Sequence, residues 1–179
     1  FYRNAAKTRR TGVEFGTQAE IFRNINLGIT YTWSDFGYLT YEAQTIEIDS
    51  LGTLVSDTRD FSGNIVPSVP ENNLYLSASY THPFGKHHHA FTRVSCQGIS
   101  GMWVDDANTD KTKGYILLNG VVGADFRWGK FNLMGSAGIN NIFDQVYAGF
   151  TNTNSANKRY YEAGAPRDFF LSLHLGYTF

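Results

Sequence analysis

The amino-acid sequence predicts an all-β fold: an antiparallel transmembrane β-barrel, of which this chain supplies about seven strands. Three observations predict it. Apolar and polar residues alternate with a period of two, the connections alternate between short and long, and aromatic residues, 16% of the chain, gather at strand ends. No helical period competes with this pattern. No run of about eighteen apolar residues occurs either, which excludes helical membrane spans.

The first two strands form the clearest hairpin in the sequence. Residues 13–21 alternate apolar side chains with Glu, Gly and Gln, and a tight turn follows at Arg23-Asn24. Residues 25–34 alternate most regularly of all, since one face carries only large apolar and aromatic side chains. That face consists of Ile25, Leu27, Ile29, Tyr31 and Trp33.

Four further strands follow a long polar stretch at residues 35–73. The fourth strand has the weakest alternation, with Val94 and Cys96 on one face and Arg93, Ser95 and Gln97 on the other. Turns or polar loops at 81–89, 105–113 and 128–130 separate these strands, and a long loop follows at 144–166. The predicted strands are residues 74–80, 90–104, 116–127 and 131–140.

The last strand, residues 169–179, is the most informative segment. Its apolar row is Phe169, Leu171, Leu173, Leu175, Tyr177 and Phe179. Small or polar residues occupy most of the other face, and the strand is long enough to cross a tilted bilayer. An aromatic carboxyl-terminal residue after such a strand is typical of outer-membrane barrels. We therefore expect Leu175, Tyr177 and Phe179 to form the membrane-insertion signal.

A period of two does not by itself distinguish a membrane barrel from a soluble, lipocalin-like barrel. Connections at 23–24, 81–89 and 128–130 are short, whereas those at 35–73, 105–113 and 144–166 are longer, as in barrels with short periplasmic turns and long extracellular loops. Aromatic residues also lie at both expected interfaces. The short-turn side holds Phe22, Tyr80, Phe84, Trp128, Phe131, Tyr177 and Phe179, and the long-loop side holds Trp33, Phe36, Tyr38, Trp103, Tyr115, Phe143 and Phe169.

Bulk properties agree with a membrane barrel and exclude other classes. The formal net charge is −1 with 17% charged residues, so no basic surface indicates nucleic-acid binding. A mean hydropathy of −0.30 suits strands that are half polar. Cys96, the single cysteine, forms no internal disulfide.

The strand count and the amino terminus predict that this chain is one segment of a larger barrel. The sequence begins Phe1-Tyr2, without an initiator Met or an apolar signal segment. Seven strands would leave two unpaired edges, whereas bacterial single-chain barrels close with an even number. We therefore expect the remaining strands to lie in another part of the same gene product or in a companion chain.

Several stretches resemble the barrel end of TonB-dependent outer-membrane receptors, most closely those for ferric siderophores and ferric citrate. They are residues 4–14, 63–70 (Gly-Asn-Ile-Val-Pro-Ser-Val-Pro), 140–144 (Asn-Asn-Ile-Phe-Asp) and 161–167 (Tyr-Glu-Ala-Gly-Ala-Pro-Arg). The resemblance implies a barrel of about 22 strands with a plug domain in its lumen. Residues 1–179 would then be the C-terminal barrel segment, without the plug and without the N-terminal part that contacts the TonB complex.

No catalytic, metal or cofactor site is expected. The sequence contains no nucleophile–base motif, HExxH or phosphate loop, so we expect no enzyme activity and no catalytic residues. The run His87-His88-His89 lies on a short turn, and neighbouring residues in an extended chain point to opposite faces. A solvated polar turn is therefore the preferred interpretation of these histidines.

The resemblance implies active import of a ferric chelate, of siderophore or citrate type, across the outer membrane of a Gram-negative bacterium. Cationic and aromatic loop residues suit an anionic chelate with planar groups. Our candidate substrate-binding residues are Arg159, Tyr147, Trp103 and Tyr160. The expected partners are outer-membrane lipid, the remaining strands and plug, the TonB complex and the chelate. Two alternatives stay open: another cargo such as cobalamin, haem or an oligosaccharide, or a structural subunit of an outer-membrane assembly.

Overall fold

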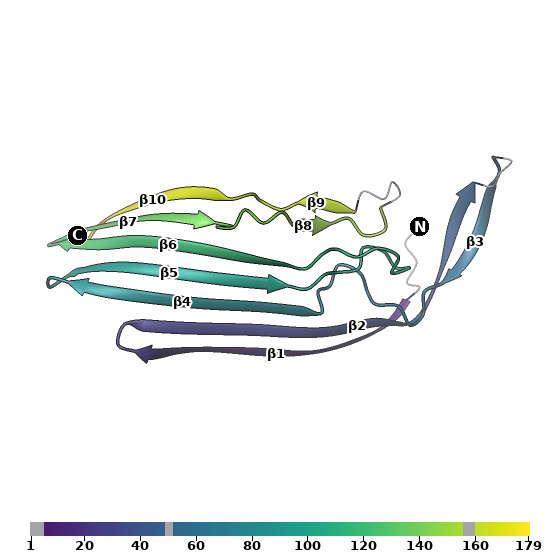
Figure 1. Ribbon diagram of the computed structural model, residues 1–179, viewed down its shortest axis with the longest axis horizontal. Coiled ribbons are helices and arrows are strands. Elements are labelled where there is room, and N and C mark those ends of the chain that lie inside the picture. The colour runs from purple at the N-terminus through teal and green to yellow at the C-terminus, as the bar shows by residue number, and fades with distance from the viewer. Residues whose placement is uncertain (1–5, 49–51, 156–159) are drawn as a thin grey trace.

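The computed structural model of the protein describes residues 6–48, 52–155 and 160–179 (Figure 1). Within these residues no helix is present that is long and apolar enough to span a membrane. The strands are β1 Ala6–Phe22, β2 Ile25–Ile48, β3 Leu54–Asp60, β4 Asn72–Phe84, β5 His88–Ile99, β6 Tyr115–Trp128, β7 Phe131–Asn140, β8 Ala148–Thr151, β9 Tyr161–Ala163 and β10 Asp168–Tyr177.

One antiparallel sheet contains all seven strands that the alternation pattern predicts. Its order is β1-β2-β4-β5-β6-β7-β10, so each strand pairs with its nearest predicted neighbour along the chain. Figure 1 shows them side by side, with the three short turns and the carboxyl terminus at one end and the long connections at the other. The predicted all-β, antiparallel architecture is confirmed.

The sheet has an apolar face that nothing in the described residues covers. The pairing aligns Leu171 with Ala137, and Ala137 with Val122, so that the apolar rows of successive strands join across the sheet. Leu171 is 88% exposed and Leu175 72% exposed, whereas Val104 is the single buried hydrophobic residue of the described part. A sheet of this kind has no apolar core of its own. Its stability therefore depends on apolar material outside the chain.

Aromatic side chains form a continuous belt at the short-turn end of this face. The rings of Phe126 and Trp128 stack at 5.4 Å, and Phe84 approaches Phe126 at 5.6 Å. Farther along, Tyr177 lies 5.0 Å from Phe131 and 5.2 Å from Phe179, between ring centroids. The insertion-signal residues thus continue the belt to the end of the chain, while their role in insertion remains a prediction.

The interpretation of the histidine run as a solvated turn is wrong for His88. Strand β5 begins at His88, and its ring lies between Phe84 at 5.7 Å and Trp128 at 5.5 Å. The His88 Nδ1 atom also accepts a hydrogen bond from the backbone N–H of Arg127 at 3.2 Å. His88 therefore belongs to the aromatic belt, because the strand continues farther toward the turn than the weak alternation indicated.

Strand lengths also differ from the sequence prediction in the long connections. Strand β2 runs on to Ile48 and pairs with β3, so residues expected to form a polar loop instead form a hairpin that extends beyond the sheet (Figure 1). β8 and β9 form a second small hairpin inside the predicted 144–166 loop. Strand β5 ends at Ile99 rather than at 104. The residues after it bond within their own connection instead, since the Thr112 N–H donates to the Met102 carbonyl at 2.8 Å and Gly101 packs against the Thr112 backbone.

The segment 140–144 makes a tight turn at the end of β7. Asn141 and Asp144 both have positive φ values, 50° and 52°, which Asn and Asp tolerate better than most residues. The Asn141 side chain is buried, accepts from the Gln145 N–H at 2.8 Å and donates to the Ala165 carbonyl at 3.2 Å. These hydrogen bonds therefore hold the start of the β7–β10 connection, at Asn141, next to its end, at Ala165.

On the polar face, two aromatic rings lie directly over glycines of the neighbouring strand. The Phe91 ring covers Gly123, and the Phe170 ring covers Gly138. A Cβ atom added at Gly123 would lie 2.5 Å from the Phe91 ring and 2.6 Å from the Gly135 carbonyl oxygen. These glycines are therefore required for packing, which alternation alone does not reveal.

We predict that Gly123→Ala destabilises the full-length protein by about 1–3 kcal/mol, because the rigid ring and the neighbouring backbone leave no space for a methyl group. The measurement is the midpoint of urea or thermal unfolding of the folded barrel.

The matched control is Gly16→Ala on the same face, where an added Cβ would meet only the Thr30 hydroxyl at 3.8 Å. This control should change stability by no more than about 0.5 kcal/mol. Equal effects of the two substitutions would contradict the packing role of Gly123.

Candidate functional site

The long connections meet at one end of the sheet around a buried carboxylate, that of Asp106, which is 7% exposed. Its Oδ1 atom accepts a hydrogen bond from the Tyr38 hydroxyl at 2.6 Å, and its Oδ2 atom accepts from the Tyr41 hydroxyl at 3.0 Å and from Asn154 Nδ2 at 2.7 Å. Its backbone carbonyl accepts from Asn64 Nδ2 at 2.7 Å. We call these five residues the loop clasp.

The loop clasp joins three connections that are far apart in sequence. Tyr38 lies in β2, and Asn64 lies in the β2–β4 connection that follows. Asp106 belongs to the β5–β6 connection and Asn154 to the β7–β10 connection. A buried carboxylate is stable when neutral donors satisfy its oxygens. The carboxylate therefore holds the three connections in one arrangement.

The clasp tyrosines remain hydrogen-bond donors over a wide pH range. Burial raises the pKa of Tyr38 well above its ordinary value of 10.0, and the hydrogen bond to Asp106 and its charge raise it further. Burial also raises the pKa of Tyr41, with the Asp106 charge as the second cause. Both phenols are thus protonated at neutral pH, which is the form that donates to a carboxylate.

The proline-containing segment 63–70 supports the clasp. Gly63 adopts φ 86°, and the Tyr38 N–H donates to the Asn64 carbonyl at 2.9 Å, so this segment runs beside β2. The Ile65 N–H donates to Asn108 Oδ1 at 2.8 Å, and Asn108 Nδ2 donates back to the Ile65 carbonyl at 2.9 Å. The motif therefore links two connections, and its two prolines, Pro67 and Pro70, lie five and two residues before β4.

A cavity of about 700 Å³ lies beside the clasp, between the β5–β6 and β7–β10 connections. Tyr115 and Tyr147 line it with their rings 4.5 Å apart, and Tyr115 is on the polar face of β6 with Asn119. Its volume is within the range of about 300–1,000 Å³ that is common for small-molecule sites. The other lining residues are Asp110, Lys111, Thr112, Lys113, Gly114, Gln145, Val146, Ala148, Tyr161, Glu162 and Ala163.

Neutral donors satisfy the carboxylates of the cavity. Asp110 accepts from the Lys111 N–H at 2.8 Å and from the Tyr161 hydroxyl, and burial with this hydrogen bond raises the pKa of Tyr161 to about 12. Glu162 accepts from Asn152 Nδ2 at 2.9 Å. Neither acid therefore needs a cation from the cavity wall.

The two lysines are accordingly available to an anion. Lys111 Nζ lies 5.2 Å from the centre of the Trp103 ring, a cation–π contact that leaves its N–H groups free to donate. In the ranges that the structure describes, no carboxylate forms an ion pair with Lys111 or Lys113. The cavity thus combines two ammonium groups with three phenol rings, those of Tyr115, Tyr147 and Tyr161. This composition suits an anionic ligand that carries planar or aromatic groups.

Metal binding by the protein itself finds no support in the described residues. No group of three or more His, Cys, Asp or Glu side chains in 6–48, 52–155 and 160–179 is arranged to hold a metal ion.

Comparisons with known proteins agree with this architecture. The family model for the TonB dependent receptor-like β-barrel matches residues 1–142. The chain belongs to this family. Its members are receptors and transporters, which agrees with the expectation that the chain is not an enzyme.

Two solved receptors share the fold. BauA, the ferric preacinetobactin receptor from Acinetobacter baumannii, is 17% identical with a TM-score of 0.73, over 97% of this chain and 23% of BauA. The ferric citrate transporter FecA, in its unliganded form, is 22% identical with a TM-score of 0.72, over 96% of this chain and 24% of FecA. The chain therefore spans about a quarter of the length of each receptor.

The sequence-predicted binding residues of this TonB-dependent receptor barrel occupy different places. Tyr147 lines the cavity, and Trp103 lies behind Lys111 with its indole Nε1 buried and unbonded. Tyr160 packs edge-on against Tyr161, with 6.2 Å between ring centroids, so it borders the cavity without lining it. Arg159 lies outside the described residues.

Sequence reasoning missed Lys111, Lys113 and the loop clasp. The 105–113 segment was predicted only as a polar loop, although Asp105 accepts hydrogen bonds from both the N–H and the hydroxyl of Thr109 and folds the segment into a tight turn. The local signal for that turn was its composition, because Asp, Asn and Thr side chains in 105–109 commonly bond to nearby backbone groups in turns. Arg167, the last residue of the 161–167 stretch, pairs with Asp144 at 3.8 Å.

We predict that Asp106→Ala loosens the three connections together. Removing the carboxylate leaves buried donors unsatisfied, at a cost of about 1–3 kcal/mol. The amides of 61–68, 102–112 and 152–155 should therefore exchange hydrogen roughly ten to a hundred times faster in the full-length receptor. Glu71→Ala, which removes an exposed acid from the same end of the sheet, is the control. Faster exchange in only one connection would show that Asp106 does not join them.

The clasp should also respond to alkaline pH. Because the folded state raises the pKa of Tyr38 and Tyr41, it retains protons that the unfolded chain releases above about pH 10. The stabilisation from the clasp is therefore complete below pH 10 and decreases as pH rises through the pKa of the folded phenols. Limited proteolysis of the same connections between pH 7 and about 12 measures this. Loss of protection between pH 7 and 9 would contradict it.

Proposed function

We propose that residues 1–179 form the C-terminal barrel segment of an outer-membrane receptor that imports a ferric chelate, of siderophore or citrate type, with energy from the TonB complex. Family membership over residues 1–142 supports the transport class. The two receptors with the same fold are a ferric preacinetobactin receptor and a ferric citrate transporter, and these ligands support an iron chelate as the proposed cargo.

One observation carries the choice of ligand: two lysine ammonium groups without carboxylate partners line the same cavity as three tyrosines. Ferric complexes of catecholate and citrate type are anionic and rich in oxygen acceptors. Lys111 and Lys113 would bind those oxygens through charge-assisted hydrogen bonds. Tyr115, Tyr147 and Tyr161 would contact the planar parts of the chelate and donate from their hydroxyl groups.

The proposal includes partners beyond this chain. β1 and β10 end the sheet order, so each has one edge without a strand among the described residues. In lipid an open edge is costly, because no water satisfies its backbone groups. The proposed receptor therefore contributes further strands to both edges, a plug domain to the lumen, and an N-terminal segment through which the TonB complex acts.

Replacing both lysines, Lys111→Glu and Lys113→Glu together, should weaken binding of the anionic chelate by about ten- to a hundredfold or more, since two charge-assisted contacts become repulsive. The measurement is uptake of radioactive iron, supplied as ferric citrate or as a ferric catecholate, by cells that have the full-length protein as their only receptor. Affinity of the purified protein for the same complexes supports the uptake result.

Lys86→Glu is the control, because it makes one such Lys-to-Glu change on a short turn at the other end of the sheet. Uptake in this variant should equal that of the wild type. Expression induced by cobalamin scarcity rather than by iron scarcity, with no uptake of either iron complex, would overturn the iron proposal in favour of another cargo.

A further inference from the structure

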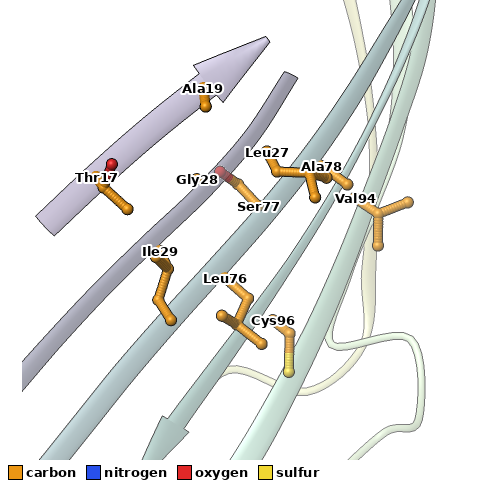
Figure 2. A pocket seen from close by; sticks show the side chains of 10 residues that line it. All are labelled: Thr17, Ala19, Leu27, Gly28, Ile29, Leu76, Ser77, Ala78, Val94 and Cys96. Carbon is orange, nitrogen blue, oxygen red and sulfur yellow. The ribbon is translucent and has the colours of Figure 1, made fainter. Parts of the chain in front are cut away.

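The apolar face of the sheet contains a groove that the proposed import of a chelate does not use. It crosses β1, β2, β4 and β5 close to the short-turn end and has a volume of about 480 Å³ (Figure 2). Leu27, Leu76 and Val94 form its walls, and each is about two-fifths exposed, at 41%, 39% and 42%. A groove of this size is large enough for a small molecule or for part of a lipid.

Small side chains create the groove. The register aligns Ala19, Leu27, Ala78 and Val94 in one row across the four strands, so small and large residues alternate. The floor reaches the backbone at Gly28 and Ser77, as Figure 2 shows between the larger side chains. Strand β10 differs, because Leu171, Leu173 and Leu175 project from the same face without a small residue between them. The residues that line the hollow all belong to β1, β2, β4 and β5.

Polar groups border the groove toward the short turns. Two residues beyond Ala78 on the same face, the Tyr80 hydroxyl is hydrogen-bonded to His82 Nδ1 at 3.0 Å. The β1–β2 turn lies beside them, because the Thr81 N–H donates to the Asn24 carbonyl at 3.0 Å. Arg23, the exposed residue of that turn, follows Phe22 at the end of β1, and Phe22 pairs with Ile25, two residues beyond the groove wall at Leu27.

The charge at this end of the sheet is positive. Each of the three short turns contains one cation, Arg23, Lys86 or Lys130. Glu20, an acid beside the β1–β2 turn, accepts a hydrogen bond from the Asn24 N–H at 2.7 Å. Asp125, near the β6–β7 turn, pairs with Arg127 at 3.2 Å. The acids are thus occupied by local partners, whereas an anion beside the groove would meet Arg23, Tyr80 and His82.

We propose that this groove binds one glycerophospholipid of the leaflet that meets the short turns, with an acyl chain on the groove floor and its phosphate at Arg23, Tyr80 and His82. The inference rests on the proposed membrane placement, but not on the identity of the cargo. Apolar walls match the chain, and the cationic turn with its neighbouring hydroxyl and imidazole matches the phosphate. Along the strands, the polar groups lie on the short-turn side of the groove, as the headgroup of a lipid in that leaflet lies on the outer side of its acyl chains.

A polypeptide is a poorer match for the same site. A strand or helix laid into the groove would place its backbone and charged groups at the depth of Leu27 and Val94, where the walls offer no polar partner. A lipid of the opposite leaflet would place its headgroup at the long-loop end, away from Arg23.

The test uses the full-length protein in mild detergent and counts bound lipid by native mass spectrometry, with dioleoyl-phosphatidylglycerol and dioleoylglycerol offered together. The two probes share their chains and differ in the phosphate. The wild type should retain one phosphatidylglycerol under conditions that remove the other lipids. Ala78→Trp fills the groove and should reduce this occupancy at least about fivefold, and Arg23→Gln should remove most of the preference for phosphatidylglycerol.

Ala137→Trp is the matched control, because Ala137 lies in the apolar row of β7 between Val122 and Leu171, outside the groove. Its lipid count should equal that of the wild type. Ala78→Leu, a smaller obstruction, provides the same comparison if the Trp variant does not fold. Equal occupancy in the Ala78 and Ala137 variants would overturn the groove assignment, and an unchanged preference in Arg23→Gln would overturn the headgroup assignment.

Iron uptake and lipid retention, both measured on the wild-type receptor, separate the two proposals. Uptake by the wild type bears on the transport proposal alone, and the retained lipid bears on the groove alone. A wild-type receptor that imports no iron complex but retains the phospholipid leaves the groove supported, and the reverse result refutes it.

Discussion

The antiparallel hydrogen-bond ladder from β1 to β10 is the interaction on which the rest of the structure depends. Between the outer edges of β1 and β10, it pairs the backbone groups of seven strands without a second layer and without an apolar core, as the single buried hydrophobic residue of the described part indicates. Because the ladder fixes register, it also fixes which side chains share a face. One face becomes continuously apolar, and the other receives the glycines, hydroxyls and charged residues.

This single-layer construction divides the chain into regions with different requirements. In the strands, the outer rows hold apolar residues of different sizes, and the small residues Ala19 and Ala78 leave a groove between larger neighbours. At the short turns, aromatic rings and cations mark one boundary of the apolar face. At the long connections, polar side chains take over the role of a core, with Asp106 as its centre.

The loop clasp and the cavity belong to the same construction. Long connections that leave a sheet have no hydrophobic core to order them, so hydrogen bonds to a buried carboxylate supply the order instead. The two connections that form the cavity walls are both held by this carboxylate, since Asp106 and Asn154 belong to them. The proposed binding site would in this way keep the positions of Lys111 and Tyr147 without the apolar packing that a soluble domain would use.

The sequence alone determined the fold class, the seven strands, the short turns and the apolar face, because period-two alternation is a local property of each strand. It also indicated Tyr147 and Trp103 as aromatic loop residues. Only the tertiary structure decided that Asp106 meets Tyr38, 68 residues away, and that Lys111 and Lys113 share a cavity with Tyr147. It decided too that β2 extends into a hairpin and that Ala78 lies in a groove. The physical reason is that such contacts depend on register and on the paths of long connections, which no local pattern specifies.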